Sequence, residues 1–254
     1  MSTPRLVTIS FSHFCEKARW SLDHARIAFR EEAHLPGFHV GPVRRARGRR
    51  STPVLVTDDG VFSDSTDIVA WAHRARPEAN LLGHSDAERR EIEELEERFD
   101  EELGPHARRW AYFHLLADRR ATLAMFAAQT ATPRHERAII PFVFPVLRGL
   151  MRRSMKIDAT RAERSRRTVD AVFDAVASRL EGGRRFLVGD SLTAADITFA
   201  SLAAPALLVD HPSFRLPPIA EVPDAAASGI RAWRAHPAGE FALRIVRDHR
   251  DRPA

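Results

Sequence analysis

Residues 52–68 read TPVLVTDDGVFSDSTDI, and this stretch decides the fold of the first part of the chain. Pro53–Thr57 is rich in valine, leucine and threonine, and Val61-Phe62 continues that character beyond the turn Asp58-Asp59-Gly60. Asp-Gly supplies the positive φ that tight turns require. The stretch therefore predicts a β-hairpin.

The residues on either side of the hairpin give the order of elements. After it, Asp64 or Ser65 caps a helix with the apolar positions Ile68, Trp71, Ala72 and Ala75. Before it, we expect a strand at Arg5–Ser10, a helix from Phe14 to about Ala28, a weaker strand at Glu31–His34 and an irregular segment over 35–50. Strands joined by a helix should be parallel, and the hairpin adds an antiparallel pair. This order predicts an α/β thioredoxin-like domain over residues 1–77.

After a linker over residues 78–84 the strand signals stop, and 85–254 is predicted to be all-helical. Pro141 and Pro145 leave the pattern over 133–157 uncertain. The expected helices are one capped by Ser85 with Glu88 and ended by Gly104-Pro105, one over His106–Ala128, one with its apolar stripe over Val169–Leu180, one starting at Thr193, and one or two around Ile230, Trp233 and Phe241.

The composition is that of an ordinary globular protein. Of 254 residues, 44% are hydrophobic and 29% charged, and the formal net charge is +5. The basic side chains are almost all arginines, with Lys17 and Lys156 the only lysines. Because acidic residues are interleaved with them, a solvated arginine-rich surface is favoured over a nucleic-acid-binding patch.

The single cysteine and the N-terminal residues indicate which cofactors and which cellular compartment to expect. Cys15 is the only cysteine, which excludes an intrachain disulfide and a cysteine-based zinc site, and we expect no metal. Met1–Ile9 lacks the apolar run of a secretion signal, and no segment reaches the ~18 apolar residues of a membrane span. We predict a cytoplasmic protein that binds neither membrane nor nucleic acid.

Ser12 follows the first strand and precedes the first helix. Free backbone N–H groups and the positive end of the helix favour an anion there. A hydroxyl at this position is also the ordinary N-terminal cap of a helix. The sequence alone leaves both interpretations open.

Two further motifs flank the hairpin. Thr52-Pro53 precedes the third strand, where proline cannot donate to the sheet and is a candidate cis peptide that turns the backbone of Thr52 outward, toward a peptide ligand. Asp64-Ser65 joins the fourth strand to the next helix, where exposed N–H groups suit a carboxylate and Asp64 suits an ammonium group. The alternatives are a proline at a strand edge and an ordinary capping cluster.

Together the three motifs resemble the cytosolic glutathione transferase family, and the resemblance covers nearly the whole chain. Ser12-His-Phe-Cys15 is similar to the Ser-x-x-Cys sequence of serine-type members. Thr52-Pro53 stands where Val-Pro is commoner, and Asp64-Ser65 where Glu-Ser or Gln-Ser is commoner. The resemblance implies a catalytic Ser12 and a glutathione site that includes Thr52, Pro53, Asp64 and Ser65.

A fourth motif lies in the helical half. Thr193-Ala-Ala-Asp196 resembles the helix-capping box of the family's C-terminal domain. The Thr193 hydroxyl can accept from the Asp196 N–H, and the Asp196 carboxylate can accept from the Thr193 N–H. Leu192 and Ile197 would then form a hydrophobic staple. We interpret this motif as structural, not catalytic.

In the function that the resemblance implies, glutathione is the co-substrate and Ser12 donates a hydrogen bond to its sulfur. Lowering the thiol pKa by two units requires only ~2.7 kcal/mol, which one charge-assisted hydrogen bond and a helix end can supply. Ser10, Cys15 and His13 are possible accessory residues. We expect Ser10 in the strand, Cys15 packed under the helix and His13 at the surface.

The resemblance also places a basic loop residue against the glycyl carboxylate of glutathione. Arg49 and Arg50 are the best candidates, although a solvated loop explains any single arginine there equally well. By analogy with the family, Asp100 or Glu101 would reach the ammonium group across a homodimer.

A small hydrophobic electrophile would bind between the domains, near Trp110, Tyr112 and Phe113, unless these residues belong to the core. The resemblance thus implies a detoxifying transferase of alkyl or aryl groups, with conjugation, peroxide reduction and isomerisation all open. The alternative is a non-catalytic ligand-binding or scaffolding protein of the same fold.

Overall fold

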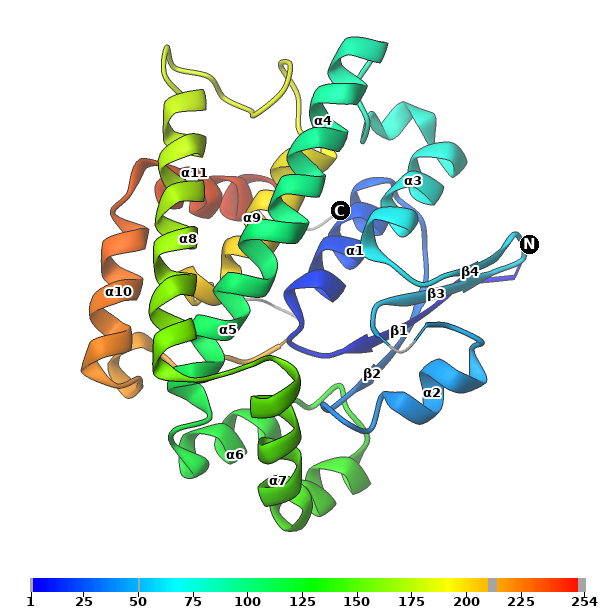
Figure 1. Ribbon diagram of the computed structural model, residues 1–254. Helices are drawn as coiled ribbons and strands as arrows, with labels where there is room; N and C mark the ends of the chain where they lie inside the picture. Colours follow the sequence, from blue (N-terminus) through cyan, green and yellow to red (C-terminus); the bar gives the residue numbers. More distant parts are fainter. Residues whose placement is uncertain (1, 50, 210–213, 251–254) are drawn as a thin grey trace.

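Four strands form one mixed sheet in the N-terminal part of the chain (Figure 1). The structure is a computed structural model that describes residues 2–49, 51–209 and 214–250. The strands are β1 Arg5–Ile9, β2 Arg30–His34, β3 Val54–Thr57 and β4 Gly60–Phe62. They lie in the order β2-β1-β3-β4, with β1 parallel to β2 and antiparallel to β3, and β3 antiparallel to β4. The predicted thioredoxin-like domain is confirmed.

Side chains on the two faces of the sheet pack against different helices. On one face, Leu6 and Leu55 join the core formed with α1 (His13–His24) and α3 (Ser65–Ala75). On the other face, Val7 and Val54 pack on α2 (Val40–Arg45). The alternation follows from the two-residue period of a strand, and it leaves β1 buried in the middle of the sheet.

Two predictions for this domain are corrected. Helix α1 ends at His24, not near Ala28, because Arg26 has a left-handed φ of 52° and the Ile27 N–H bonds back to the Leu22 carbonyl. The segment over 35–50 is not wholly irregular, since α2 lies within it. Its Pro42 is tolerated because it falls in the first turn of the helix.

A long helical rod begins the second half, running through α4 (Asp86–Arg98), a π-helical segment Phe99–Leu103 and α5 (Gly104–Leu115) (Figure 1). The prediction that Gly104-Pro105 ends a helix is wrong. The Gly104 N–H bonds to the Phe99 carbonyl, five residues back, and Pro105 falls in the first turn of α5. Wider i→i+5 bonding thus lets the rod continue through the proline.

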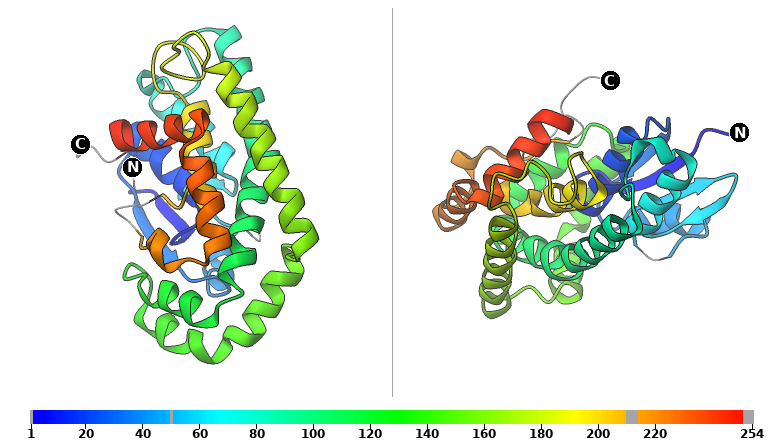
Figure 2. Two further views of the ribbon diagram at one scale, coloured as in Figure 1. Left: turned by 90° about the vertical axis from the view of Figure 1, so that its left-hand side faces the viewer. Right: turned by 90° about the horizontal axis from the view of Figure 1, so that it is seen from above.

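Residues 106–128 form two helices, contrary to prediction. Helix α5 ends at Leu115, and α6 (Arg119–Ala127) starts anew because Asp118 caps it, accepting from the Ala121 N–H at 3.0 Å. Helix α7 (Arg134–Ser154) then runs through both Pro141 and Pro145. Figure 2 shows α6 and α7 gathered at one end of the molecule.

Helix α9 (Ala194–Leu207) is the buried centre of the helical half, packed against α1, α4 and α5. Around it lie α8 (Ala159–Arg179), α10 (Asp224–Arg234) and α11 (Pro237–Ile245). The capping box predicted at its start is confirmed: the Asp196 carboxylate accepts from the Thr193 N–H at 2.9 Å. The fold is therefore a small sheet domain followed by a helical domain, as predicted.

Among the described residues, none of the helices combines the length and apolar character that a membrane crossing requires.

Candidate functional site

Ser12 lies at the first turn of α1, on the wall of a cavity between the two domains. Its backbone is extended, and its N–H bonds to the Ile9 carbonyl at 3.0 Å, which closes the turn from strand to helix. The Ser12 Oγ accepts from the Cys15 N–H at 3.5 Å. Capping and donation are compatible, because a hydroxyl carries two lone pairs and one proton. The cap does not use the Ser12 proton, but the same hydroxyl also hydrogen-bonds the buried Cys15 thiol.

The three neighbours of Ser12 occupy different surroundings. Cys15 is completely buried, and burial raises the pKa of its thiol. Ser10 is buried too, and its hydroxyl donates to Gln129 Oε1 at 3.2 Å. His13 was expected at the surface, and this is wrong. It is buried at the cavity wall, with Nε2 3.0 Å from the Gly104 carbonyl oxygen.

The His13–Gly104 contact joins α1 to α5 next to Ser12. Burial, helped by the charge of Arg108, lowers the pKa of His13 to about 3, so the ring is neutral and its Nε2–H donates. A side chain at Gly104 would place a Cβ 2.5 Å from the Phe14 ring. Glycine therefore permits the close approach of the two helices that frames Ser12.

The motifs around the hairpin come together beside α1. The Thr52-Pro53 peptide bond is cis, and Thr52 hydrogen-bonds the Cys15 thiol. The Arg49 N–H donates to Ser63 Oγ at 3.1 Å, which ties the arginine-rich loop to the end of β4. The Arg49 side chain is exposed and lines the cavity, whereas Arg50 lies outside the described residues.

Asp64 caps α3 by accepting from the Thr66 N–H at 2.9 Å, and its side chain is exposed. Ser65 is buried. Next to them, the buried Lys17 ammonium binds Asp100 Oδ2 at 2.8 Å and Thr66 Oγ1 at 2.9 Å. Asp100 thus bonds within its own chain, and its other carboxylate oxygen is buried with no partner among the described residues.

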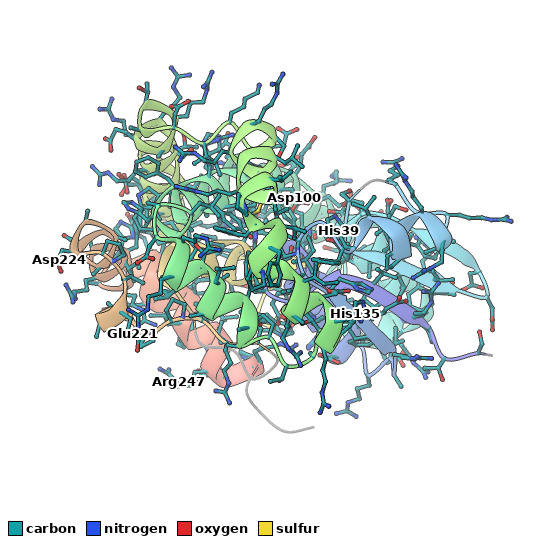
Figure 3. The ribbon with its side chains drawn as sticks, turned by 90° about the horizontal axis from the view of Figure 1, so that it is seen from below. His39, Asp100, His135, Glu221, Asp224 and Arg247 are labelled. Carbon is teal, nitrogen blue, oxygen red and sulfur yellow. The ribbon has the colours of Figure 1, made fainter. Side chains whose placement is uncertain are left out.

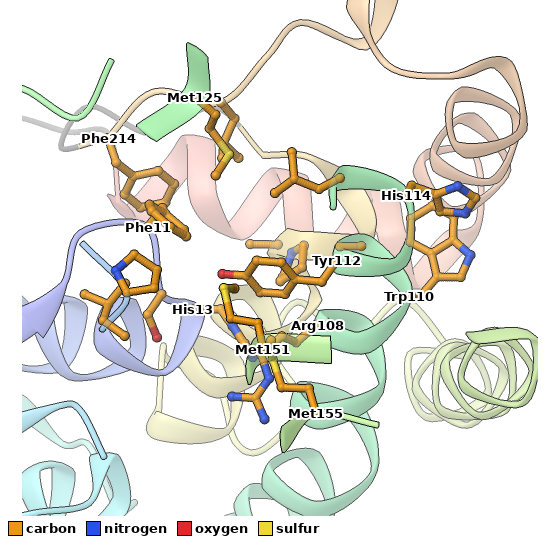
Figure 4. Close-up of a pocket in the computed structure, with 18 of the residues that line it drawn as sticks. Phe11, His13, Arg108, Trp110, Tyr112, His114, Met125, Met151, Met155 and Phe214 are labelled. Atoms are coloured by element: carbon orange, nitrogen blue, oxygen red, sulfur yellow. The ribbon is translucent and has the colours of Figure 1, made fainter. Parts of the chain in front are cut away.

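The cavity has a volume of about 910 Å³. Its wall is mostly apolar, and both domains contribute to it. Figure 4 shows Tyr112 in its middle, with Phe11, Met125 and Phe214 on one side of the ring and Trp110 and His114 on the other. Viewed from below, Glu221 lies toward one side of the molecule and His39 nearer its middle, and both line the cavity (Figure 3).

The predicted site residues divide into two groups. Ser12, His13, Arg49, Trp110 and Tyr112 line the cavity. Four residues predicted to bind glutathione do not line the cavity and lie around the starts of α1 and α3: Thr52, Pro53, Asp64 and Ser65. Two possible accessory residues, Ser10 and Cys15, lie behind the cavity wall. Phe113 is also absent from the wall and packs on the apolar cluster that contains Leu116 and Phe126. Trp110 belongs mainly to the core, 4.5 Å from the Trp233 ring.

Sequence reasoning missed Arg108 and helix α7. Arg108 precedes Tyr112 by four residues and Leu115 follows by three, so the helical period places all three on one face of α5. That spacing was a usable signal. Met151 of α7 and Met155, the residue after this helix ends, also line the cavity, but the two prolines made the helix hard to predict. The described residues contain no cluster of His, Cys, Asp or Glu that would hold a metal ion.

Family models match two separate segments of the chain. Residues 6–80 match the glutathione S-transferase N-terminal domain, and residues 159–236 match the glutathione S-transferase C-terminal domain. Helices α4–α7 lie between the two matches. A search of curated proteins found no match.

Solved structures share the fold over nearly the whole chain. A glutathione S-transferase from Rhodospirillum rubrum F11 has a TM-score of 0.61 and 20% identity, covering 99% of this chain and 89% of that chain. One from Methylobacterium radiotolerans, in complex with glutathione sulfonate, has a TM-score of 0.52 and 20% identity, covering 95% of each chain. Poplar glutathione transferase F1 has a TM-score of 0.55 and 11% identity, covering 98% and 100%. At these identities the likeness shows the fold alone.

Proposed function

We propose that this chain, which belongs to the glutathione S-transferase family, is a serine-type member that holds the sulfur of glutathione as a thiolate with the Ser12 hydroxyl. The observation that carries the proposal is the position of Ser12, at the N-terminus of α1 and on the wall of the cavity between the domains. The cap does not use its hydroxyl proton, which would turn from the Cys15 thiol to the sulfur of bound glutathione.

Glutathione would lie along the edge of the sheet domain. The backbone of Thr52 before Pro53 would pair with the cysteinyl part, and Asp64 and the N–H groups near Ser65 would take the γ-glutamyl end, which carries an ammonium and a carboxylate on one carbon. The exposed Arg49, with Arg50 next to it in the sequence, would bind the glycyl carboxylate. Each charged end of the tripeptide would thus meet a partner of complementary charge, and its middle would pair with backbone.

The second substrate would be a small electrophile with an apolar body, bound in the cavity against Tyr112 and Trp110, with Phe113 behind the wall. The thiolate sulfur forms a bond to the electrophilic carbon, and the leaving group departs with its electron pair. Catalysis beyond thiolate formation comes from holding the two reactants in contact. We further propose that the enzyme is cytoplasmic, homodimeric and serves detoxification.

The test is retention on immobilised glutathione together with turnover of a panel of aryl halides. We expect Ser12→Ala to bind glutathione nearly as well as wild type and to lose about 30- to 100-fold in kcat/KM, the value of one hydrogen bond to a charged group. Ser10→Ala is the matched control, because that buried hydroxyl bonds to Gln129. Retention without turnover would identify a non-catalytic binding protein, and equal turnover of Ser12→Ala would refute the assignment.

A further inference from the structure

Arg108 is a partly buried cation on α5 that lacks a carboxylate partner among the described residues. Its Nε is buried and makes no hydrogen bond within that part of the chain. The guanidinium carbon lies 5.9 Å from the centre of the Phe14 ring. By contrast, three other buried or partly buried cations, Lys17, Arg19 and Arg250, each contact two carboxylates.

The electrostatics of Arg108 reflect this isolation. Burial lowers the pKa of its guanidinium, Tyr112 opposes that shift, and the neighbouring Arg109 adds to it. An isolated charge in apolar surroundings is unfavourable until an opposite charge joins it. Arginine is the side chain best suited to bind a carboxylate or sulfonate, because its planar guanidinium offers two parallel N–H donors.

Tyr112 stands one helical turn after Arg108 and faces the same cavity (Figure 4). Burial raises the pKa of its hydroxyl to about 12, so the group keeps its proton and can donate. His13, across the cavity wall, is neutral. The apolar remainder of the wall includes Phe11, Leu147 and Met151. Arg108 and Tyr112 thus place a cation and a hydroxyl donor together on one face of α5, beside a largely apolar wall. Other charged residues line the same cavity: Arg44 and Arg49 from the sheet domain, and the carboxylates Glu16, Asp118 and Glu221.

We propose that Arg108 and Tyr112 bind an anionic group of the second substrate, which is an amphipathic carboxylate or sulfonate with its apolar body in the cavity. The proposal rests on the proposed function for the identity of the reaction, but the anion site itself requires only the cavity. Arg108 belongs to the helical domain, whereas the residues proposed for glutathione belong to the sheet domain. The anion recognised is therefore on the electrophile and not on glutathione.

A matched pair of electrophiles tests this. In 4-chloro-3-nitrobenzoate and 4-chloro-3-nitrobenzamide the glutathione thiolate attacks the same ring carbon, the carbon–sulfur bond forms, chloride leaves with the electron pair, and the thiol proton has passed to solvent. Only the benzoate carries a charge. Because the amide activates the ring more than the carboxylate does, each kcat/KM is divided by the rate constant of the uncatalysed reaction with glutathione. On that scale we expect wild type to prefer the benzoate, and Arg108→Met to lose roughly tenfold to a hundredfold of that preference. The KM for glutathione should not change.

Two variants and one binding measurement separate the outcomes. Arg108→Lys should recover part of the preference, and Arg120→Leu, at an exposed position on α6, should leave it intact. Calorimetry with unreactive 4-methyl-3-nitrobenzoate, without glutathione, should give binding to wild type that Arg108→Met weakens by a similar factor. Such binding without turnover of either electrophile would refute the proposed function and leave the anion site standing.

The proposal is overturned if wild type shows no preference between the two electrophiles. It is also overturned if Arg108→Met affects both equally while raising the KM for glutathione, since Arg108 would then bind a carboxylate of glutathione.

Discussion

The helices α1 and α9 both begin with a hydroxyl residue as N-terminal cap, but the α1 cap lies at a cavity and the α9 cap is buried. Each helix is capped by a hydroxyl residue, Ser12 or Thr193. At α9 the cap is reciprocal and buried, and the Asp196 carboxylate accepts from both the Thr193 and Leu187 N–H groups. At α1 the cap is a single bond of 3.5 Å at the edge of a cavity.

The two ends also differ in what holds them. The Asp196 side chain closes the α9 cap with residues three to nine positions away, and one long-range bond, from the Ala194 N–H to the Leu81 carbonyl at 2.8 Å, also holds this helix start. The α1 start is positioned from far along the chain, with His13 contacting Gly104 and Ser10 contacting Gln129. At the start of α9 the backbone N–H groups are paired within the protein and stabilise the fold; we call this the closed end. At the start of α1, the open end, a hydroxyl and the positive end of the helix remain available for a ligand.

The largest expected effect is at the closed end. Asp196→Ala leaves the buried N–H groups of Leu187 and Thr193 without acceptors, so we expect a loss of about 3 kcal/mol in the free energy of unfolding. Denaturant unfolding measures it. Asp190→Ala, exposed in the preceding loop, is the control and should change stability by less than about 0.5 kcal/mol. A loss of the same small size in Asp196→Ala would contradict the account of a closed end.

A smaller, pH-dependent effect is expected among the long-range contacts near the open end. His34, at the end of β2, lies 2.5 Å from Glu136 of α7 and 3.3 Å from Glu32. Burial lowers the pKa of His34, but the hydrogen bonds and charges of Glu136 and Glu32 outweigh it, so the pKa lies above its ordinary value. The charged pair therefore stabilises the fold fully below the unfolded pKa, and this is lost as pH rises through the folded pKa.

His34→Gln should accordingly lower the free energy of unfolding by roughly 1.5 kcal/mol near pH 6, where the pair is charged. The deficit should shrink as pH rises above the folded pKa of His34. Urea unfolding over a range of pH measures this deficit. The control is His135→Gln, at an exposed position on α7 next to Glu136. A deficit that grows with pH would show the sign to be wrong.

The smallest expected effect is the contribution of Ser12 to stability. Its long single cap bond predicts that Ser12→Ala costs only about 0.5–1 kcal/mol in the free energy of unfolding. Thr193→Ala should lose more, about 1–2 kcal/mol, because its hydroxyl is part of a buried reciprocal box. Thermal unfolding of the two variants side by side compares the ends directly. If Ser12→Ala lowered stability more than Thr193→Ala, the main role of Ser12 would be to cap the helix.

The sequence predicted the features that depend on neighbouring residues better than those that depend on distant ones. The hairpin, the thioredoxin-like order and the capping box at Thr193 depend on residues close together in the chain, and all three are confirmed. His13 was misplaced because its partner, Gly104, lies 91 residues away. The continuous rod through Pro105 depends on π-helical bonding that no residue pattern announced.

The cavity wall was predicted only in part for a similar reason. Tyr112 stood out as an aromatic residue on a predicted helix, whereas Arg108 looked like one of many surface arginines. Only the structure shows that this particular arginine lies on the cavity wall and that no carboxylate among the described residues pairs with it.

Ionisation of the bound glutathione thiol tests the central claim most directly. Far-ultraviolet absorbance of the thiolate, followed as a function of pH, measures its pKa in the complex. The account predicts a pKa about two units below the ~8.5 of a free thiol in wild type, returning by at least about one unit in Ser12→Ala. The same pKa in both proteins would contradict it.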